Sequence, residues 1–272
     1  MDIATIVGLI AALVLVAGSV FVGEGIHGFA AFVSAEAFMV VIGGTVSAIL
    51  VNYPLKQVLG VFKVLGKAFS STEEDTSQIV GIFVNLAVKA RQKGFLSLEE
   101  DVKKIDNDFL KRGMQLLIDG ADHEFIVTMM ETEMGFIKER HKVGQEIFNA
   151  LGTYAPALGI IGTVLGMILM LRTLEDAAEV PRRMALALAA AFYGLGAGYM
   201  IFLPIAGKLK RRSEEELLVK EIIVRGILLI QAGTSPSVVE ANLVAYLDPS
   251  ARKLIKKDSG STGKTAGTAG GK

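Results

Sequence analysis

Four stretches of this sequence are long and apolar enough to cross a lipid bilayer. They run from about Ile3 to Gly23, from Ala35 to Tyr53, from Ile147 to Leu171 and from Met184 to Gly207. A helix needs about 20 mostly apolar residues to span about 30 Å of hydrocarbon. The chain is therefore predicted to be an all-α, polytopic membrane protein with four transmembrane helices.

Basic residues mark the ends of these spans unequally. The ends of spans two, three and four that lie away from the two short connections are flanked by Lys56, Lys63, Lys67, Lys138, Arg140, Lys142, Lys208, Lys210, Arg211 and Arg212. Positive residues close to a span end indicate the cytoplasmic side. The connection at 172–183 also holds arginines, but an even number of spans with both flanks basic leaves one consistent topology. We expect both termini to be cytoplasmic.

The spans and their flanks divide the chain into five segments. A transmembrane hairpin at 1–53 precedes a helical cytoplasmic domain at 54–146. A second hairpin at 147–207 precedes a cytoplasmic helix at 208–257, and the Gly-, Ser-, Thr- and Lys-rich segment 258–272 is predicted to be a disordered tail.

Helical periodicity continues into the charged segments. Between 76 and 90 the apolar residues recur at the spacing of one helix face, at Ile79, Ile82, Phe83, Leu86 and Ala87. Ser97 to Glu100 has the S-x-x-E form of a capping box, which predicts that a new helix begins there. Further helices are expected at 101–118, at 123–140 and through 208–230.

No ionisable residue interrupts any of the four spans, because Glu24, Glu36, Arg172 and Glu175 lie at their edges. Pathways for protons or sodium normally need an intramembrane carboxylate or its equivalent. An ion moved by this protein would therefore be held by a partner. Thr163 is the most suggestive polar side chain of span three, although a threonine hydroxyl commonly bonds back to its own helix.

Spans three and four carry small residues about one turn apart, at Gly159, Gly162, Gly166, Gly194 and Gly198. Small residues let membrane helices approach closely. Two explanations stay open: tight packing within one chain, or a smooth lining for a helix of another subunit. Spans one and two lack such residues and are expected to face lipid.

Each of these two spans also holds a proline, Pro156 early in span three and Pro204 late in span four. A proline frees a backbone carbonyl and bends the helix. A bend alone explains most membrane prolines. Two at matching depth beside the soluble domain suggest a hinge that couples the two parts.

Several function classes find no support in the composition. The chain has 28 basic and 28 acidic residues, no cysteine and only three histidines, which are scattered. No nucleophile motif, phosphate loop, metal-ligand spacing or nucleic-acid footprint is present. We expect no catalysis, no metal, no cofactor and no nucleic-acid partner.

The combination of span order and motifs resembles the MotA/PomA family, the A subunits of the bacterial flagellar stator. The resemblance rests on Tyr154-Ala155-Pro156, Gly159, Gly162-Thr163-Val164 and Gly166 in span three, and on Met184-Ala185, Tyr193-Gly194, Pro204-Ile205-Ala206 and Lys208-Leu209 in span four. It implies a homopentamer of A subunits around two single-span B subunits in the inner membrane. The B subunit would supply the membrane aspartate, and ion flow would drive torque on the flagellar rotor.

The resemblance also implies roles for single residues. Pro156 and Pro204 match the family's functional prolines, and the glycines of spans three and four would pack around the B subunit. Arg91, Glu99 and Glu100 match charged positions that engage a protein of the rotor switch complex. A simpler explanation is that cations suit helix C-termini and anions suit N-termini. Gln92 stands where sodium-driven relatives have a second basic residue.

The choice of ion follows from hydroxyl groups. Sodium-driven members resemble one another in having threonines in spans three and four, whereas this chain keeps Thr163 but has Ala190 and Ala191. Hard cations are held by oxygen ligands. We therefore predict an ion pathway past these three residues that carries protons rather than sodium.

Two other functions compete with this one. The ExbB/TolQ type of energiser has three spans, with one of them before the cytoplasmic loop, whereas this chain has two spans before that loop. A non-flagellar motor with four spans is a closer alternative to the stator subunit. A passive membrane scaffold would need only the small-residue packing and the charged domain, and would leave the paired prolines and the Arg91/Glu99 arrangement unexplained.

Overall fold

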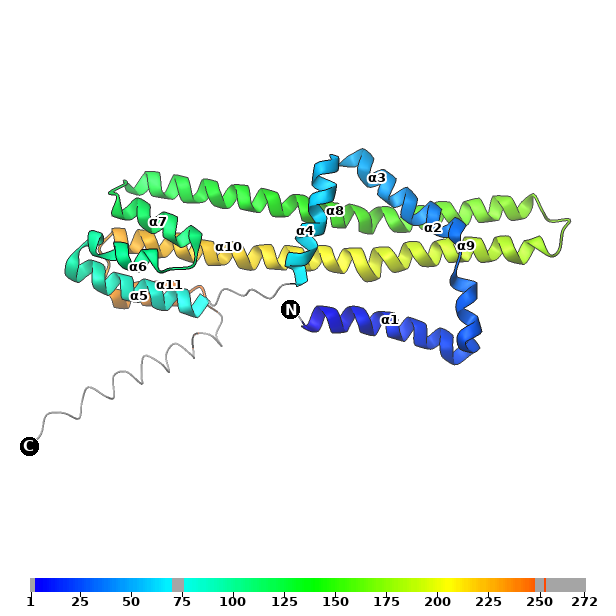
Figure 1. The fold of residues 1–272 in the computed structure, drawn as a ribbon, viewed down its shortest axis with the longest axis horizontal. Helices are drawn as coiled ribbons and strands as arrows, with labels where there is room; N and C mark the ends of the chain where they lie inside the picture. The colour runs from blue at the N-terminus through cyan, green and yellow to red at the C-terminus, as the bar shows by residue number, and fades with distance from the viewer. Residues whose placement is uncertain (1–2, 70–75, 248–251, 253–272) are drawn as a thin grey trace, which may run out of the picture. The chain divides into compact units, whose positions relative to one another are not determined.

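A computed structural model describes residues 3–69, 76–247 and 252, and every regular element among them is a helix (Figure 1). The chain forms two compact units. Of the described residues, the first unit contains 3–69 and 139–213, and the second contains 76–138, 214–247 and 252. The predicted segments 54–146 and 208–257 are each divided between the two units, and the predicted tail at 258–272 lies outside the described residues.

The four predicted spans are confirmed as helices long and apolar enough to cross a membrane. The first is α1 (Ile3–Glu24), followed by the 3₁₀ helix η1 (Gly25–Phe32), and the second joins α2 (Ala35–Phe38), the π-helical η2 (Met39–Gly43) and α3 (Gly44–Asn52). The third lies in α8 (His123–Leu171), and the fourth joins α9 (Glu179–Leu195), the π-helical η4 (Gly196–Phe202) and α10 (Leu203–Gln231). Helix α4 (Leu55–Phe69) follows the second span after Pro54.

Glycine brings α8 and α9 together in the first unit (Figure 1). A Cβ atom added at Gly166 would lie 2.9 Å from the backbone nitrogen of Ala187, and one added at Gly194 would lie 2.6 Å from the carbonyl oxygen of Ala155. Carbon atoms do not approach neighbours this closely, so only glycine fits at these positions. The two helices therefore pack backbone to backbone, as small residues allow in membranes.

Span two is only partly as predicted. Span one agrees with a lipid-facing helix, because its most apolar window contains no buried residue. In span two, however, Ala37 and Val41 form a buried cluster with Ala189 and Ala190 of α9. Ile49 joins a second cluster with residues of α8 and α10. One face of span two is therefore covered by protein, and the prediction that it faces lipid is wrong for that face.

The loop between spans one and two is held by Tyr193 of α9. The Tyr193 hydroxyl donates to the carbonyl oxygen of Phe32 and accepts from the backbone N–H of Ser34 at 3.1 Å. Ser34 then caps α2, because its hydroxyl accepts from the N–H of Ala37 at 3.2 Å. Phe32 also packs edge-on against Phe192, with ring centroids 5.1 Å apart. These contacts set where span two begins.

The second unit has an apolar core of its own. Helices α5 (Thr76–Lys93), α6 (Glu99–Lys103), α7 (Asp108–Ile118) and α11 (Pro236–Val244) surround it with one end of α8 and of α10. The predicted stripe of α5 is confirmed: Ile79, Phe83, Leu86 and Ala87 are buried and Ile82 packs against them. Gly226 of α10 faces the Phe83 ring so closely that an added Cβ would lie 2.6 Å from its Cδ1.

Two local predictions in this unit are only partly confirmed, because α6 begins at Glu99 as the S-x-x-E pattern predicts but without the predicted cap, and the second helix is interrupted. Ser97 lies within the 3₁₀ helix η3 (Phe95–Leu98), and its hydroxyl donates to the carbonyl of Gly94 at 2.7 Å instead of capping α6. The predicted helix at 101–118 is two helices, since α6 ends at Lys103 and the Asn107 side chain caps α7 by accepting from Leu110 at 2.9 Å. The predicted continuation of span four is confirmed by α10.

Candidate functional sites

Thr163, Ala190 and Ala191 lie on neighbouring helices but in different surroundings. The Thr163 hydroxyl donates to the carbonyl oxygen of Ile160 at 2.6 Å, the common outcome for a threonine in a helix. Ala190 is fully buried, and its methyl group fills the space above Gly162. Ala191 is partly exposed, and a Cβ atom added at Gly159 would lie 3.6 Å from the Ala191 Cα. Their role in ion passage stays a prediction.

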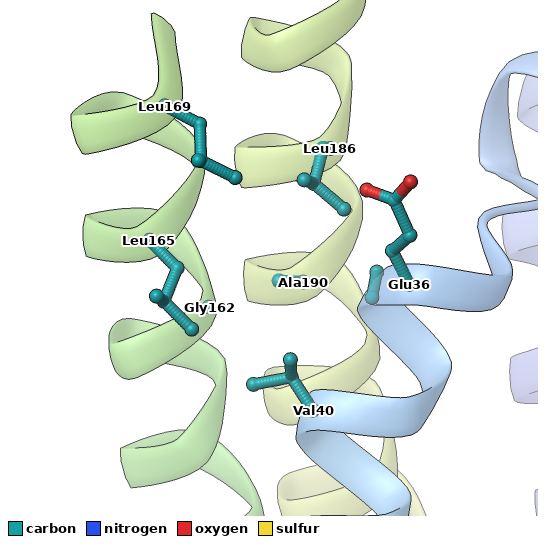
Figure 2. A pocket seen from close by; sticks show the side chains of 8 residues that line it. Glu36, Val40, Gly162, Leu165, Leu169, Leu186 and Ala190 are labelled. Atoms are coloured by element: carbon teal, nitrogen blue, oxygen red, sulfur yellow. The ribbon is translucent and has the colours of Figure 1, made fainter. Parts of the chain in front are cut away.

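A small cavity of about 120 Å³ lies beside Ala190, between span two and the α8–α9 pair (Figure 2). Its lining is apolar except for one carboxylate, and consists of Glu36, Ala37, Val40, Gly162, Leu165, Leu169, Leu186 and Ala190. Thr163 does not line it. A partner reaching Thr163 would therefore do so outside this cavity.

Glu36 is a cavity residue that sequence reasoning placed only at a span edge. In Figure 2 it reaches from α2 towards Leu186 of α9. Its carboxylate lies 3.8 Å from the Arg183 guanidinium, which is also 3.4 Å from Glu179. The pair joins the starts of spans two and four. The i,i+4 spacing of Glu179 and Arg183 was visible in the sequence, whereas the contact with Glu36 was not.

The two prolines lie at neighbouring levels of the packed helices. Pro156 is inside α8, and its ring lies against Gly198, where an added Cβ would be 2.6 Å from the Pro156 Cγ. Pro156 also leaves the Gly152 carbonyl without its usual helical donor. Gly152 in turn contacts Leu203, the residue before Pro204. These contacts bring the two prolines close to one another; the coupling role stays a prediction.

The π-helical turn η4 ends immediately before the α10 helix that carries Pro204. A π turn is a common way to accommodate a break in the helical hydrogen-bond ladder. Pro204 is exposed, while Ile205 and Ala206 are buried.

All five glycines singled out in the sequence lie at contacts within the chain. Gly159, Gly162 and Gly166 of α8 meet residues of α9, Gly194 meets α8, and Gly198 meets Pro156. The structure thus accounts for their spacing by packing within one chain, the first of the two explanations above. Their contact with a B subunit remains a prediction.

Arg91 and the acidic pair occupy the helix ends that the sequence predicts for them. Arg91 is in the last turn of α5, and Glu99 and Glu100 are in the first turn of α6. All three side chains are exposed. Glu99 accepts a hydrogen bond from Lys103 at 2.8 Å, which lowers the pKa of Glu99 and raises the pKa of Lys103. Glu100 and Arg91 have no ion pair within the described residues.

A second ion pair, missed by sequence reasoning, ties α5 to α6. Lys89 donates to Asp101 at 2.7 Å, and this hydrogen bond lowers the pKa of the Asp101 carboxyl. The two residues are 12 positions apart, so no helical periodicity relates them. The pair fixes how the helix end with Arg91 is placed against the start of α6.

Replacing Asp101 with asparagine is expected to lower the melting temperature of the purified chain slightly at pH 7, because the Lys89 pair is lost. A carboxyl whose pKa is lowered by folding stabilises the protein above its unfolded pKa, near 3.8. That stabilisation disappears as the pH falls through the folded pKa. Circular dichroism melts should therefore show a gap between wild type and variant at pH 7 that closes at strongly acidic pH.

The matched control is Glu99→Gln, which removes an ion pair within one turn of α6. The Glu99–Lys103 pair joins no two helices, so its loss should lower the melting temperature at pH 7 by less than the loss of the Lys89–Asp101 pair does. If wild type and Asp101→Asn differ in melting temperature by the same amount at pH 7 and in strong acid, the stabilisation by Asp101 is not electrostatic.

Comparison with known proteins gives matches over nearly the whole chain. Residues 101–222 match the model of the MotA/TolQ/ExbB proton channel family. The chain is 35% identical to the chemotaxis protein PomA of Vibrio alginolyticus over 93% of its own length and 98% of that protein.

Two solved structures are similar to this chain. The structure of C. jejuni MotAB has a TM-score of 0.84 at 26% identity, over 92% of this chain and 97% of that one. The flagellar MotAB stator complex from Bacillus subtilis has a TM-score of 0.82 at 32% identity, over 91% of this chain and 96% of that one. With its four apolar helices and the glycine-packed α8–α9 pair, this chain belongs to the MotA/PomA family within the MotA/TolQ/ExbB proton channel family.

Proposed function

We propose that this protein is the A subunit of a flagellar stator, an ion-driven unit that with a B subunit couples ion flow across the bacterial inner membrane to torque on the rotor. The observation that carries the proposal is the match of over nine-tenths of the chain to A subunits in solved MotAB structures. The family is one of proton channels, not of enzymes.

The division of labour follows from the chemistry of the spans. The described spans place their carboxylates at the ends, and the Thr163 hydroxyl already bonds to its own helix. A proton crossing the bilayer needs a titratable group at membrane depth. The B subunit supplies it as an aspartate on a single span, beside α8 and α9. Five A subunits around two B subunits provide the ring that turns.

The second unit, with residues 76–138 and 214–247 and called the soluble unit from here on, transmits the motion. Arg91, Glu99 and Glu100 are exposed at the facing ends of α5 and α6, and they meet a protein of the rotor switch complex. Pro156 and Pro204 couple the membrane helices to this unit. Both termini are cytoplasmic.

Protons are the coupling ion. Ala190 and Ala191 offer no hydroxyl, and Ala190 is buried against Gly162, so span four gives sodium no side-chain oxygen there. The two spans before the soluble unit favour a flagellar A subunit over a three-span ExbB/TolQ energiser.

The test is motility in a bacterium that lacks its own stator A subunit. Expressed with its cognate B subunit, this chain should restore swimming, and a proton uncoupler should stop that swimming whether or not sodium is present. Swimming that survives the uncoupler and follows the sodium gradient would overturn the choice of ion. A stable A–B complex that restores no swimming would overturn the flagellar role.

A further inference from the structure

The soluble unit has a preformed notch directly beside Arg91. Its volume is about 100 Å³, and it is lined by Ala87, Ala90, Arg91, Phe95, Ile230, Gly233 and Thr234. Most of this lining is apolar, with Arg91 as the single charged residue. The notch was not visible in the sequence, because its walls come from helices about 140 residues apart.

Two helix ends with glycine in the left-handed region build the notch. Gly94, at φ 78°, ends α5, and Gly233, at φ 67°, follows α10. At the end of α10 the N–H of Gly233 bonds to Ile230 at 2.9 Å and that of Thr234 bonds to Leu229 at 3.1 Å. This is the hydrogen-bond pattern of a Schellman motif, which fixes the path of the departing chain. The notch is thus set by backbone geometry.

The charges around the notch leave Arg91 available to a partner. Lys89 and Glu99, its neighbours on α5 and α6, are already paired with Asp101 and Lys103. Arg91 is exposed and has no ion-pair partner among residues 76–247 of the structure. A surface with a free guanidinium beside an apolar hollow complements a carboxylate beside an apolar side chain.

The size of the notch selects the kind of apolar side chain. A buried cavity of about 150 Å³ holds a benzene ring. At about 100 Å³ this notch suits a branched aliphatic side chain better than an aromatic one. Leu96, which follows the lining residue Phe95 in the sequence, is 77% exposed.

We infer that the notch receives an aliphatic side chain of the rotor protein, whose neighbouring carboxylate pairs with Arg91. This inference rests on the proposed function. The notch adds an apolar contact to the charge contact of Arg91. This apolar contact contributes affinity at any ionic strength, and it determines which segment of the rotor protein docks.

The test uses Ala90→Leu, which fills the notch from α5, and Thr234→Leu, which fills it after α10. The control is Ala241→Leu, an exposed alanine of α11 that does not line the notch. Purified A–B complexes carrying each change would be titrated with the purified rotor protein of the same bacterium at low and high salt, beside Arg91→Ala. Circular dichroism and size-exclusion profiles would identify folded complexes.

Both notch variants should bind about tenfold more weakly or worse at either salt concentration, since one buried aliphatic side chain contributes that much. Arg91→Ala should instead lose affinity at low salt and flatten the salt dependence. Ala241→Leu should match wild type.

Wild-type affinity in a folded Ala90→Leu or Thr234→Leu complex would overturn the notch while leaving the proposed function intact. A wild-type complex that does not bind the rotor protein would overturn the proposed partner and the notch with it.

Discussion

Replacing Gly194 with alanine should prevent α8 and α9 from packing and abolish function. The added Cβ would lie 2.6 Å from the carbonyl oxygen of Ala155 and 2.9 Å from the Cα of Gly159. Both are backbone atoms, so no side-chain rotation relieves the clash and the helices must move apart. Overpacking of this kind costs about 1–3 kcal/mol. The variant should melt lower and restore little or no swimming.

Gly196→Ala is the matched control, two residues along the same span. An added Cβ there meets nothing within 4 Å. Because alanine favours a helix over glycine by up to about 1 kcal/mol, this variant should melt at or above the wild-type temperature. Equal melting temperatures for the two variants would contradict the glycine-packed interface.

Features set by local pattern could be predicted from the sequence. The four spans follow from bilayer thickness, the buried stripe of α5 from helical period, and the continuation of span four from an unbroken helical segment. The capping box predicted where α6 begins but not how it is capped. Gly94, at φ 78°, precedes a 3₁₀ turn in which the Ser97 hydroxyl donates to the Gly94 carbonyl instead of capping α6.

Features set by contacts between distant residues could not be predicted. The Glu36–Arg183 pair, the hold of Tyr193 on Phe32 and Ser34, and the Lys89–Asp101 pair each depend on how helices are placed against one another. Ala190 shows the same limit. The sequence placed it on a predicted ion pathway, and it could not show that span two covers Ala190 through Ala37 and Val41.

Ion conduction should depend completely on the partner subunit. The described spans keep their carboxylates at the ends, and the polar Thr163 has its hydrogen bonded to Ile160. Moving a proton through such a set of helices without a titratable group would expose charge to hydrocarbon, at a cost of several kcal/mol or more. The loss of the partner's aspartate should therefore reduce conduction by orders of magnitude, although the complex still assembles.

The direct measurement is proton flux into liposomes under an imposed pH gradient and membrane potential. We expect the purified chain alone to give the flux of empty liposomes, the A–B complex to conduct protons, and a complex with the membrane aspartate changed to asparagine to fall back to the empty-liposome value. Proton flux through this chain alone, or undiminished flux through the aspartate variant, would contradict the account.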